Sequence, residues 1–493
     1  MIIKSLFPSL GVGLLFTVLG VSSSPAAEPI DIGSRLELFV DDYLIDTTNG
    51  AELRLHQPTA RNIALAADQP WDGNGLGYVT VFQDGDIYRM YYRGVNTKWK
   101  PGELVNTRQK YCYAESKDGI HFSKPALGLI DFKGSKQNNI IWEGKGVHNF
   151  SPFKDTNPDC KPDEKYKAVG GGPMLAFKSA DGIRWSLMRK EPIITYGDFD
   201  SQNLAFWDSV RGEYRDYHRK GRNGRDILTC TSSDFLNWTE PVFLDYLPGR
   251  LYQLYTNQIM PYPRAPHIFV GFPTRYHDRG WTPSTDDLPQ IEHRKKRAAT
   301  SPREGSALTD GLFMSSRDAQ TFNMWAEAFV RPGPQRVGAW FYCDHYQNWG
   351  LVETKSILDG GPDELSIYLT ENTANTTDVA YMRRYTLRMD GFVSVAARAD
   401  GGRFVTKPIR FDGSELVMNF STSVAGGVRV EIQDENGTPI KGYTMAESVD
   451  AFGDELERVV RWKAGTDVRS LAGSTVRLVF ELRDADLYSI RFR

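Results

Sequence analysis

Cysteine is scarce in this chain. The sequence has four cysteines among 493 residues, Cys112, Cys160, Cys230 and Cys343, and no two of them form a CxxC pair. Four scattered cysteines argue against a disulfide scaffold, which is rich in cysteine, and against a zinc cluster, which needs closely spaced cysteine pairs. We expect buried free thiols, with one long-range disulfide as the alternative.

The chain also lacks an excess of positive charge. Lysine and arginine total 59, aspartate and glutamate total 62, and the formal net charge is −3 at pH 7. A nucleic-acid-binding surface needs a clear basic excess to neutralise phosphates, so nucleic acid is not an expected partner. The basic run at 292–297 is predicted to be an exposed loop with solvated charges, and polyanion binding is the alternative.

Signature phrases of several enzyme classes are missing. The sequence contains no GxGxxG, P-loop, HExxH or GxSxG phrase, so nucleotide, zinc-protease and serine-hydrolase chemistry has no support. No loop carries the alternating carboxylates of an EF-hand. We expect no required cofactor and no catalytic metal, and we retain a structural Ca²⁺ ion as an option.

Long apolar runs are confined to the N-terminus. One lysine precedes an apolar stretch at 11–21, and small residues follow it. This order is typical of a secretory signal peptide, and the apolar core is shorter than the roughly 20 residues that a membrane-spanning helix needs. We expect residues 1–27 to be a signal peptide and the mature protein to be secreted or periplasmic, without a membrane partner.

Glycine, proline and aromatic residues are plentiful, with 45 Gly, 26 Pro, 23 Tyr and 11 Trp. This composition favours short strands and tight turns, and therefore an all-β fold. A seven-residue phrase occurs four times, as SKDGIHF, SADGIRW, SSDFLNW and SRDAQTF, beginning at Ser116, Ser179, Ser232 and Ser316. Its aspartate can accept backbone N–H bonds, and glycine, where the phrase has one, supplies a positive φ, so each phrase predicts a turn between strands.

Repeated strand–turn–strand units of this kind predict the blades of a β-propeller, with a β-sandwich carrying long loops as the alternative. From Tyr381 onward the chain changes to regular alternating strands separated by glycine-rich turns. That length of alternating strands is typical of a two-sheet β-sandwich.

Several phrases together resemble the five-bladed β-propeller glycoside hydrolases, the superfamily that includes families 32, 43, 62, 68 and 117. They are FVDDYLID, PWDGNG, YRMYYRG, HNFSPFKDTNP, DFDSQNLAFWD and the repeated SxDGxx[FW] turn, and they cover residues 36–372. The resemblance implies a five-bladed β-propeller at 28–375, followed by an accessory β-sandwich at 376–493. It also implies that the innermost strands direct acidic side chains towards a sugar at the propeller axis.

Glycosidic cleavage needs two carboxyl groups, because one protonates the leaving oxygen while the other activates water or attacks the sugar. By the resemblance, Asp72 is a candidate base or nucleophile, Asp155 orients the substrate, and Asp200 belongs to the third blade. Asp72 and Asp155 also suit ordinary turns. No glutamate occupies the DFDSQN phrase, where the superfamily usually has its acid, so Glu327 and Glu353 are further candidates for the proton donor.

Six other residues are expected to contact the substrate. Arg275 suits an anionic sugar, because its planar fork binds a carboxylate or sulfate bidentately, and Trp71, Trp99 and Trp281 are candidates for stacking on sugar faces. Structural roles or solvated turns are the alternatives for these side chains. The candidate substrate-binding residues are His148, Gln202, Asn203, Arg275, His277 and Asp310.

The sequence therefore predicts a secreted glycoside hydrolase that acts on a polysaccharide or oligosaccharide through paired carboxylates at the propeller axis. The main alternative is a carbohydrate-binding propeller without catalysis, which the missing third-blade glutamate favours. A structural or adhesive surface protein is a third interpretation. The sugar, the linkage, the stereochemistry and the oligomeric state stay open.

Overall fold

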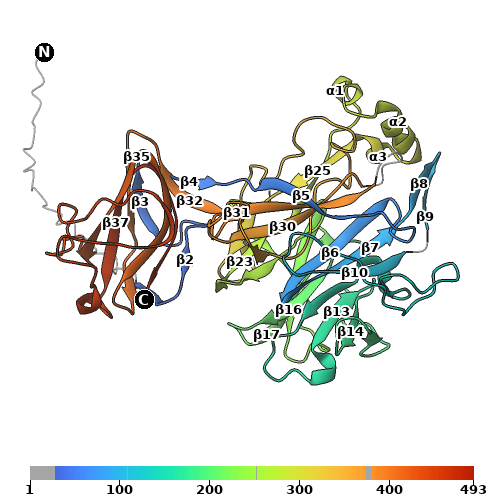
Figure 1. Ribbon diagram of the computed structural model, residues 1–493, viewed down its shortest axis with the longest axis horizontal. Coiled ribbons are helices and arrows are strands. Elements are labelled where there is room, and N and C mark those ends of the chain that lie inside the picture. The colour runs from blue at the N-terminus through green and yellow to red at the C-terminus, as the bar shows by residue number, and fades with distance from the viewer. Residues whose placement is uncertain (1–27, 108, 251, 374–378) are drawn as a thin grey trace, which may run out of the picture.

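The computed structural model describes residues 28–107, 109–250, 252–373 and 379–493, so the predicted signal peptide at 1–27 lies outside the described residues. Strands make up 49% of the protein and helices 6%. Figure 1 shows a large body built from several sheets and a smaller body that holds the C-terminus. The predicted all-β fold is confirmed.

Three four-stranded sheets follow one another along the first half of the large body, and each is a simple meander. The first contains β6 (Gly75–Asp84), β7 (Ile87–Val95), β10 (Lys110–Ser116) and β11 (Ile140–Trp142). The second contains β12 (Ser151–Lys154), β13 (Tyr166–Gly170), β14 (Leu175–Ser179) and β15 (Ser186–Leu187). The third contains β16 (Leu204–Asp208), β17 (Glu213–Gly221), β18 (Arg225–Ser232) and β19 (Val242–Phe243).

Two larger sheets complete the series. The fourth contains β22 (Met260–Tyr262), β23 (Ala265–Gly271), β26 (Met314–Ser316), β27 (Thr321–Met324) and β20 (Asp245–Leu247). A companion sheet beside it contains β21 (Gln253–Leu254), β24 (Thr274–Asp278) and β25 (Ala307–Gly311). The fifth contains β28 (Tyr346–Gln347), β29 (Val352–Thr354), β30 (Glu364–Glu371), β31 (Tyr381–Arg388) and β5 (Thr59–Ala66).

The sheets are arranged as the blades of a five-bladed β-propeller. β6 contacts both β12 and β29, and β12 contacts β16, so these strands are the innermost strands of their blades. The first and fifth blades are joined by hydrogen bonds from Val81 N to Trp349 O at 2.8 Å and from Trp349 N to Val79 O at 2.9 Å. Buried aromatic and aliphatic side chains fill the spaces between the blades.

The four repeated phrases form the same turn in four blades. Each begins at the last residue of the third strand of its blade, as Ser179 does at the end of β14. The serine hydroxyl donates to the aspartate two residues later, at 3.0 Å from Ser179 to Asp181, and that aspartate accepts backbone N–H bonds further along. The residue after each aspartate has a left-handed φ of 67° to 76°, and these residues are Gly119, Gly182, Phe235 and Ala319.

The smaller body is a β-sandwich made of one ten-stranded sheet that wraps around its own apolar core. Six of its strands come from the C-terminal region. They are β32 (Val393–Ala397), β33 (Gly402–Thr406), β34 (Ile409–Phe411), β35 (Leu416–Asp434), β36 (Asp454–Val459) and β37 (Val476–Phe492). The other four come from the N-terminal region and are β1 (Ile30–Gly33), β2 (Glu37–Leu38), β3 (Ile45–Asn49) and β4 (Ala51–Leu55).

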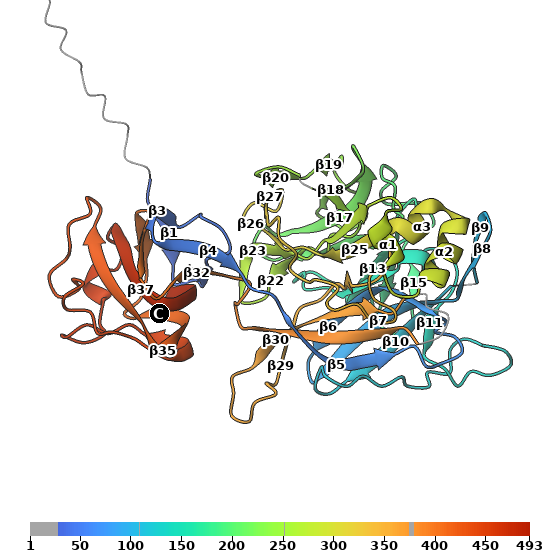
Figure 2. The same ribbon diagram turned by 90° about the horizontal axis from the view of Figure 1, so that it is seen from above.

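Strand pairing does not follow the expected division between 28–375 and 376–493. β1 pairs with β34, β2 with β37, β3 with β33 and β4 with β32, so residues 30–55 belong to the sandwich sheet. β31 lies beyond residue 376, yet it pairs with β5 and β30 in the fifth blade. The chain therefore passes between the two bodies after β4 and again after β31 (Figures 1 and 2).

A small helical layer stands beside the propeller, next to the hairpin of β8 (Thr97–Lys100) and β9 (Glu103–Asn106) (Figures 1 and 2). Its helices are α1 (Pro283–Asp286), α2 (Ile291–Thr300) and α3 (Pro302–Ser306). The basic run at 292–297 is helical, and Arg294 and Arg297 in it are buried, so the expectation of a solvated loop is wrong. Arg294 packs 4.1 Å from the ring centre of Phe341, which shields its charge from water.

None of the helices in the described part of the chain combines the length and the hydrophobicity that crossing a membrane requires.

Candidate functional site

A pocket of about 180 Å³ opens near the points where the innermost strands begin, and we call it the central pocket. Tyr78 reaches it from β6, Tyr346 from β28, and His148 from η1 (Val147–Asn149), just before β12. Asp200 and Tyr255 come from the segments before β16 and β22, while the helical layer contributes Glu304. Several blades therefore converge on this pocket, as the sequence resemblance implies.

Asp200 is a carboxylate held in a fixed position at the pocket. Its Oδ1 lies 3.1 Å from His148 Nε2, and its Oδ2 lies 3.0 Å from Arg219 Nη2. Burial alone would raise the pKa of Asp200, but the hydrogen bond from His148 and the charge of Arg219 outweigh it and lower the pKa to about 2. Asp200 is therefore ionised at neutral pH, and its side chain stays 64% exposed to the pocket.

His148 links Asp200 to the floor of the pocket. Burial lowers the pKa of His148 more than the carboxylate of Asp200 raises it, so the imidazole is neutral near pH 7. His148 Nδ1 lies 3.2 Å from Arg93 Nη1 and 3.1 Å from Gln109 Oε1, while Nε2 faces the ionised Asp200, which can only accept; a neutral ring that donates to Asp200 therefore leaves Nδ1 as the acceptor for Arg93. The remaining proton is on Nε2, which donates it to Asp200.

Aromatic rings form much of the remaining wall. Burial raises the pKa of Tyr78, Tyr255 and Tyr346, so their hydroxyl groups keep their protons. Ring faces and protonated hydroxyls are the groups with which proteins contact the two chemical sides of a sugar. The other aromatic side chains that line the pocket are Trp99 and Tyr342.

Left-handed backbone conformations surround the pocket at residues other than glycine. Tyr78 has φ 50° and Cys343 has φ 75°, and both line the pocket, while Phe199 has φ 49° and directly precedes Asp200. Each such residue costs free energy on the order of 1–3 kcal/mol and is kept only where the surroundings impose it. Tyr78 lies in the irregular part of β6, between Gly77 and Thr80, where the register with β7 shifts.

Glu304 is a second carboxyl group at the pocket, and sequence reasoning missed it. Of the carboxyl side chains that the structure describes, only Asp200 and Glu304 line the central pocket. Glu304 is buried, 3.5 Å from Arg297 and 3.5 Å from Arg303. Its position inside a polar, basic insertion predicts a solvated loop, and only the folding of α2 and α3 brings it to the pocket.

The structure therefore brings three predicted residues, Asp200, His148 and Trp99, together in one pocket. Gln202 and Asn203 lie buried beneath it. Gln202 donates to Val79 O at 3.1 Å and accepts from Gln258 at 2.8 Å. Asn203 donates to Phe199 O at 3.0 Å, which braces the segment that carries Asp200.

Asp72 lies away from the central pocket, at a turn before β6. Its carboxylate is buried and forms an ion pair of 2.6 Å with Lys124, and Tyr92 donates to it at 2.9 Å. Burial raises the pKa of Asp72, although Lys124 and Tyr92 counteract the shift. These partners stabilise the turn, and the catalytic assignment of Asp72 stays a prediction.

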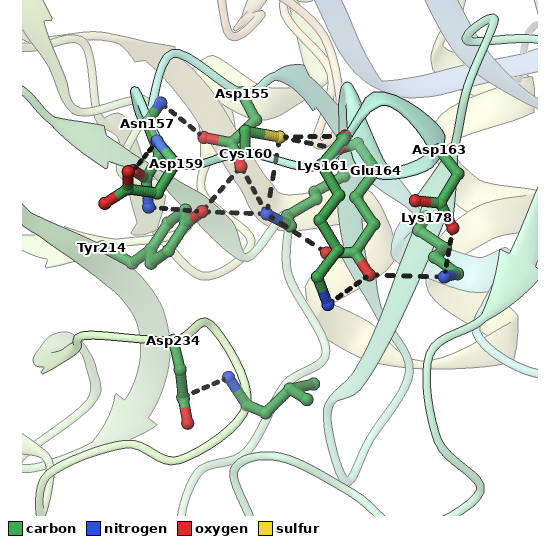
Figure 3. A network of polar contacts seen from close by, with 12 residues as sticks. Asp155, Asn157, Asp159, Cys160, Lys161, Asp163, Glu164, Lys178, Tyr214 and Asp234 are labelled. Atoms are coloured by element: carbon green, nitrogen blue, oxygen red, sulfur yellow. Dashed lines mark hydrogen bonds and ion pairs between the residues drawn. The ribbon is translucent and has the colours of Figure 1, made fainter.

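Asp155 is also held in a buried polar network rather than at the central pocket (Figure 3). Lys167 forms a close ion pair with it, and Tyr214 donates to the same oxygen at 2.6 Å. Asn157 N donates to its other oxygen at 2.9 Å. This network joins β13 to β17, and the role of Asp155 in orienting a substrate stays a prediction.

Glu353 is exposed on β29 between two buried neighbours, and its backbone carbonyl accepts a hydrogen bond of 2.8 Å from Tyr88. It does not belong to the described lining of the central pocket. Its assignment as a proton donor also stays a prediction.

Four other candidates line a second pocket of about 630 Å³ beside β24 and β25. They are Arg275, His277, Asp310 and Glu327. Arg275 binds Asp310 through both ends of its fork, with Nε 2.7 Å from Oδ1. The fork that was expected to bind an anionic sugar is therefore already occupied by a carboxylate of the protein.

The three predicted stacking tryptophans lie in different places. Trp99 lines the central pocket, Trp71 donates from its indole to Asn139 at 2.6 Å, and Trp281 is 42% exposed beside the helical layer.

One group of side chains in the described residues could hold a metal ion. Asp216 and Cys230 are paired across β17 and β18, and His218 lies two residues along β17. Their ligand atoms lie within 4.8 Å of one another, and all three side chains are buried. Sulfur and nitrogen donors suit a transition metal rather than Ca²⁺, so the option of a structural Ca²⁺ ion gains no candidate from this group. All four cysteines are free.

No protein-family model matches the chain. Two uncharacterised proteins of Mycobacterium tuberculosis are each 30% identical to it over 154 residues, which is 31% of this chain and 44% of each relative. The chain thus spans less than half the length of these curated relatives.

Solved structures similar to the chain include several glycoside hydrolases. A family 43 arabinoxylan arabinofuranohydrolase from Bacillus subtilis matches 88% of this chain and 99% of its own, with 11% identity and a TM-score of 0.42. The catalytic domain of a family 62 α-L-arabinofuranosidase from Coprinopsis cinerea matches 67% and 97%, with 10% identity and a TM-score of 0.39. A family 32 β-fructofuranosidase from Bombyx mori matches 89% and 94%, with 9% identity and a TM-score of 0.36.

These neighbours come from three of the families that the sequence resembles. At such identities and scores, however, the activity of this chain has to be inferred from its own side chains.

Proposed function

We propose that the protein is a secreted glycoside hydrolase that binds and cleaves a polysaccharide or oligosaccharide in the central pocket. The observation that carries this proposal is the ionised Asp200, fixed by His148 and Arg219 in an aromatic-lined pocket where several blades converge. Export is supported by the N-terminal sequence at 1–27.

Asp200 suits the role of base or nucleophile. A carboxyl group with a pKa of about 2 is ionised at working pH, so it can attack the sugar or accept a proton from water, but it has no proton to donate. His148 fixes the orientation of this carboxylate through its Nε2 proton. Arg219 holds the second oxygen and keeps the group charged.

Glu304 is our candidate for the proton donor, because it is the other described carboxyl group at the pocket. It is buried, and burial favours the protonated form of a carboxyl group, whereas the neighbouring Arg297 and Arg303 favour the ionised form. A bound sugar that displaces water or attracts one of these arginines would shift the balance towards the acid.

The test is the substitution Asp200→Asn, which keeps the shape of the side chain and removes its charge. We expect sugar release from a panel of purified polysaccharides to fall by at least about a hundredfold. Asp198→Asn is the matched control, because Asp198 is two residues away and binds Lys220 at 3.2 Å. Full activity of Asp200→Asn would contradict the proposal.

A carbohydrate-binding protein without catalysis is the second candidate function. The observation in its favour is that both carboxylates of the pocket face arginines, which stabilise the ionised form. In that case a glycan array would show binding that Asp200→Asn weakens, and no polysaccharide in the panel would be cleaved even after days.

A further inference from the structure

The central pocket is rich in arginine side chains that are not fully hydrogen bonded. Arg93, Arg297 and Arg303 line it, and Arg219 lies directly behind Asp200. These four guanidinium groups outnumber the two carboxylates of the pocket, and His148 adds no charge because its imidazole is neutral.

Each of the four arginines keeps at least one buried N–H nitrogen without a hydrogen-bond partner in the part of the chain that the structure describes. These nitrogens are Arg93 Nε, Arg219 Nη1, Arg297 Nε and Arg303 Nη1. Trp99 Nε1 is a fifth buried donor without a hydrogen-bond partner among the described residues. Arg297 is 1% exposed and Arg219 is 8% exposed, so water reaches these two groups poorly, whereas the side chain of Arg303 is 41% exposed.

Aromatic rings hold the guanidinium groups in place. The carbon at the centre of the Arg93 fork lies 4.5 Å from the ring centre of Tyr78, and that of Arg303 lies 5.1 Å from the ring centre of Tyr342. Stacking on a ring fixes the plane of the fork but satisfies none of its N–H groups. The planes of the Arg93 and Arg303 forks are therefore fixed beside the pocket.

A buried N–H donor without a hydrogen-bond partner raises the free energy of the folded protein, and a buried excess of positive charge raises it further. An acceptor that carries negative charge would remove both costs at once. Neutral sugar hydroxyls would satisfy single donors, but they would leave the excess charge uncompensated. The arrangement thus favours an anion over a neutral ligand.

We propose that the carbohydrate bound in the central pocket is acidic, and that these arginines recognise a carboxylate or sulfate group on it. This inference rests on the proposed function, and it names the class of sugar. A planar guanidinium matches both anions bidentately. The second pocket is not the expected anion site, because Asp310 already occupies the fork of Arg275 there.

The experiment is titration calorimetry on the full chain with matched probes. These are D-galacturonate and D-glucuronate for the carboxylate, galactose 6-sulfate for the sulfate, galactose and glucose as neutral sugars, and acetate and inorganic sulfate as bare anions. We expect the acidic sugars to bind at least about tenfold more tightly than the neutral sugars, a preference that salt weakens. Comparison of the uronates with the sulfated sugar shows which anion the pocket takes.

Two substitutions locate the site. Arg303→Gln should remove the preference for acidic sugars, because it deletes one unused donor without touching Asp200. Arg279→Gln is the control, since Arg279 is an exposed residue of the second pocket, and it should keep the preference.

Equal affinity for acidic and neutral sugars would overturn the inference and leave the proposed function intact. If acetate and inorganic sulfate bind as tightly as the acidic sugars, the pocket is an anion site rather than a sugar site, and both proposals fail. Loss of the preference in Arg279→Gln alone would also overturn the inference, because it would move anion binding to the second pocket.

Discussion

At the scale of single residues, the buried ion pair of Asp72 and Lys124 gives a prediction about stability. We expect Lys124→Met to lower the free energy of unfolding by roughly 3 kcal/mol, because it leaves the buried Asp72 without its cation. Urea denaturation measures the change. Lys117→Met is the control, since Lys117 is exposed in the neighbouring turn and should change the stability little.

Asp72→Asn extends this test to function. A structural role predicts lower stability with sugar release retained at permissive temperature. Loss of sugar release at unchanged stability would instead support the catalytic assignment made from the sequence.

His148 gives a pH-dependent prediction. Its folded pKa is lowered by burial, so below the unfolded pKa of roughly 6.5 the unfolded chain takes up a proton more readily than the folded one. The contribution of His148 to stability is therefore present above that pH and is lost as the pH falls. We expect His148→Gln to lose less stability than the wild-type protein between pH 7.5 and pH 5.5, measured by urea denaturation at both pH values.

If both proteins lose the same stability over this range, the pKa of His148 is not lowered in the folded protein. The comparison of the two proteins matters because other histidines also titrate here, and His218 has its pKa raised rather than lowered.

The sequence could predict Asp200 and His148 because each lies in a short phrase with a recognisable place in a blade. It could not predict the partners of Asp72 and Asp155. Lys124 lies 52 residues from Asp72, and Lys167 lies on the strand that follows Asp155. Whether a carboxylate faces a pocket or a buried lysine depends on tertiary contacts that no local pattern contains.

At the scale of elements, the repeated turns depend on their aspartates. Asp234 accepts hydrogen bonds from Leu236 N at 2.9 Å and from Asn237 N at 2.8 Å. We expect Asp234→Ala to destabilise the protein by about 1–2 kcal/mol, because these N–H groups lose their acceptor. Thermal and urea unfolding measure the effect, and Asp359→Ala, at an exposed loop position, is the control.

The contribution of Asp234 to the stability of the protein depends on pH. Burial alone would raise the pKa of Asp234, but the hydrogen bonds lower it to about 2. A lowered carboxyl pKa gives stability that is present above the unfolded pKa of roughly 3.9 and is lost as the pH falls towards 2. Asp234→Ala should therefore differ from the wild-type protein at pH 5 and much less at pH 2. An equal difference at both pH values would rule out the ionised acceptor.

The turns illustrate what local sequence can and cannot specify. The hydrogen bonds of the turn can be predicted from the phrase alone, because all their donors and acceptors lie within seven residues. It does not predict that Phe235 and Ala319 take the left-handed conformation that glycine takes elsewhere. The basic run at 292–297 likewise does not predict a helix with buried arginines. Arg294 is buried against Phe341, which is distant in the sequence.

At the scale of the whole molecule, strand pairing predicts which fragments fold. A fragment of residues 28–375 keeps β5 and β30 but lacks β31, which lies between them in the fifth blade. It also exposes β1 to β4 without their partners. We expect this fragment to be insoluble or unfolded, whereas a fragment of residues 57–390 keeps all five blades and should give a cooperative thermal transition.

Circular dichroism and size-exclusion chromatography of the two fragments check this prediction. A soluble, cooperatively folding 28–375 fragment would contradict the pairing. This strand pairing could not be predicted from the sequence. β1 and β2 are short, and nothing in their residues identifies pairing partners that lie near the other end of the chain.

Polar contacts fix the two bodies to one another. Arg317, which follows β26, binds Glu37 at 2.7 Å and Asp41 at 2.9 Å, and these acids lie in and just after β2. Burial alone would raise the pKa of Glu37, but the bonds from His267 and Arg317 lower it to about 2. The sandwich is thus anchored to the fourth blade at neutral pH.

The pairing of β1 with β34 also sets the order of events during translation. Ile30 is synthesised early, and its partner Ile409 is made only after all five blades of the propeller. At ribosomal rates of about 5–20 residues per second, this delay is on the order of tens of seconds. Throughout that interval the first strands offer unpaired edges to other nascent chains. Faster elongation or a chaperone that shields residues 30–55 should therefore raise the yield of soluble protein.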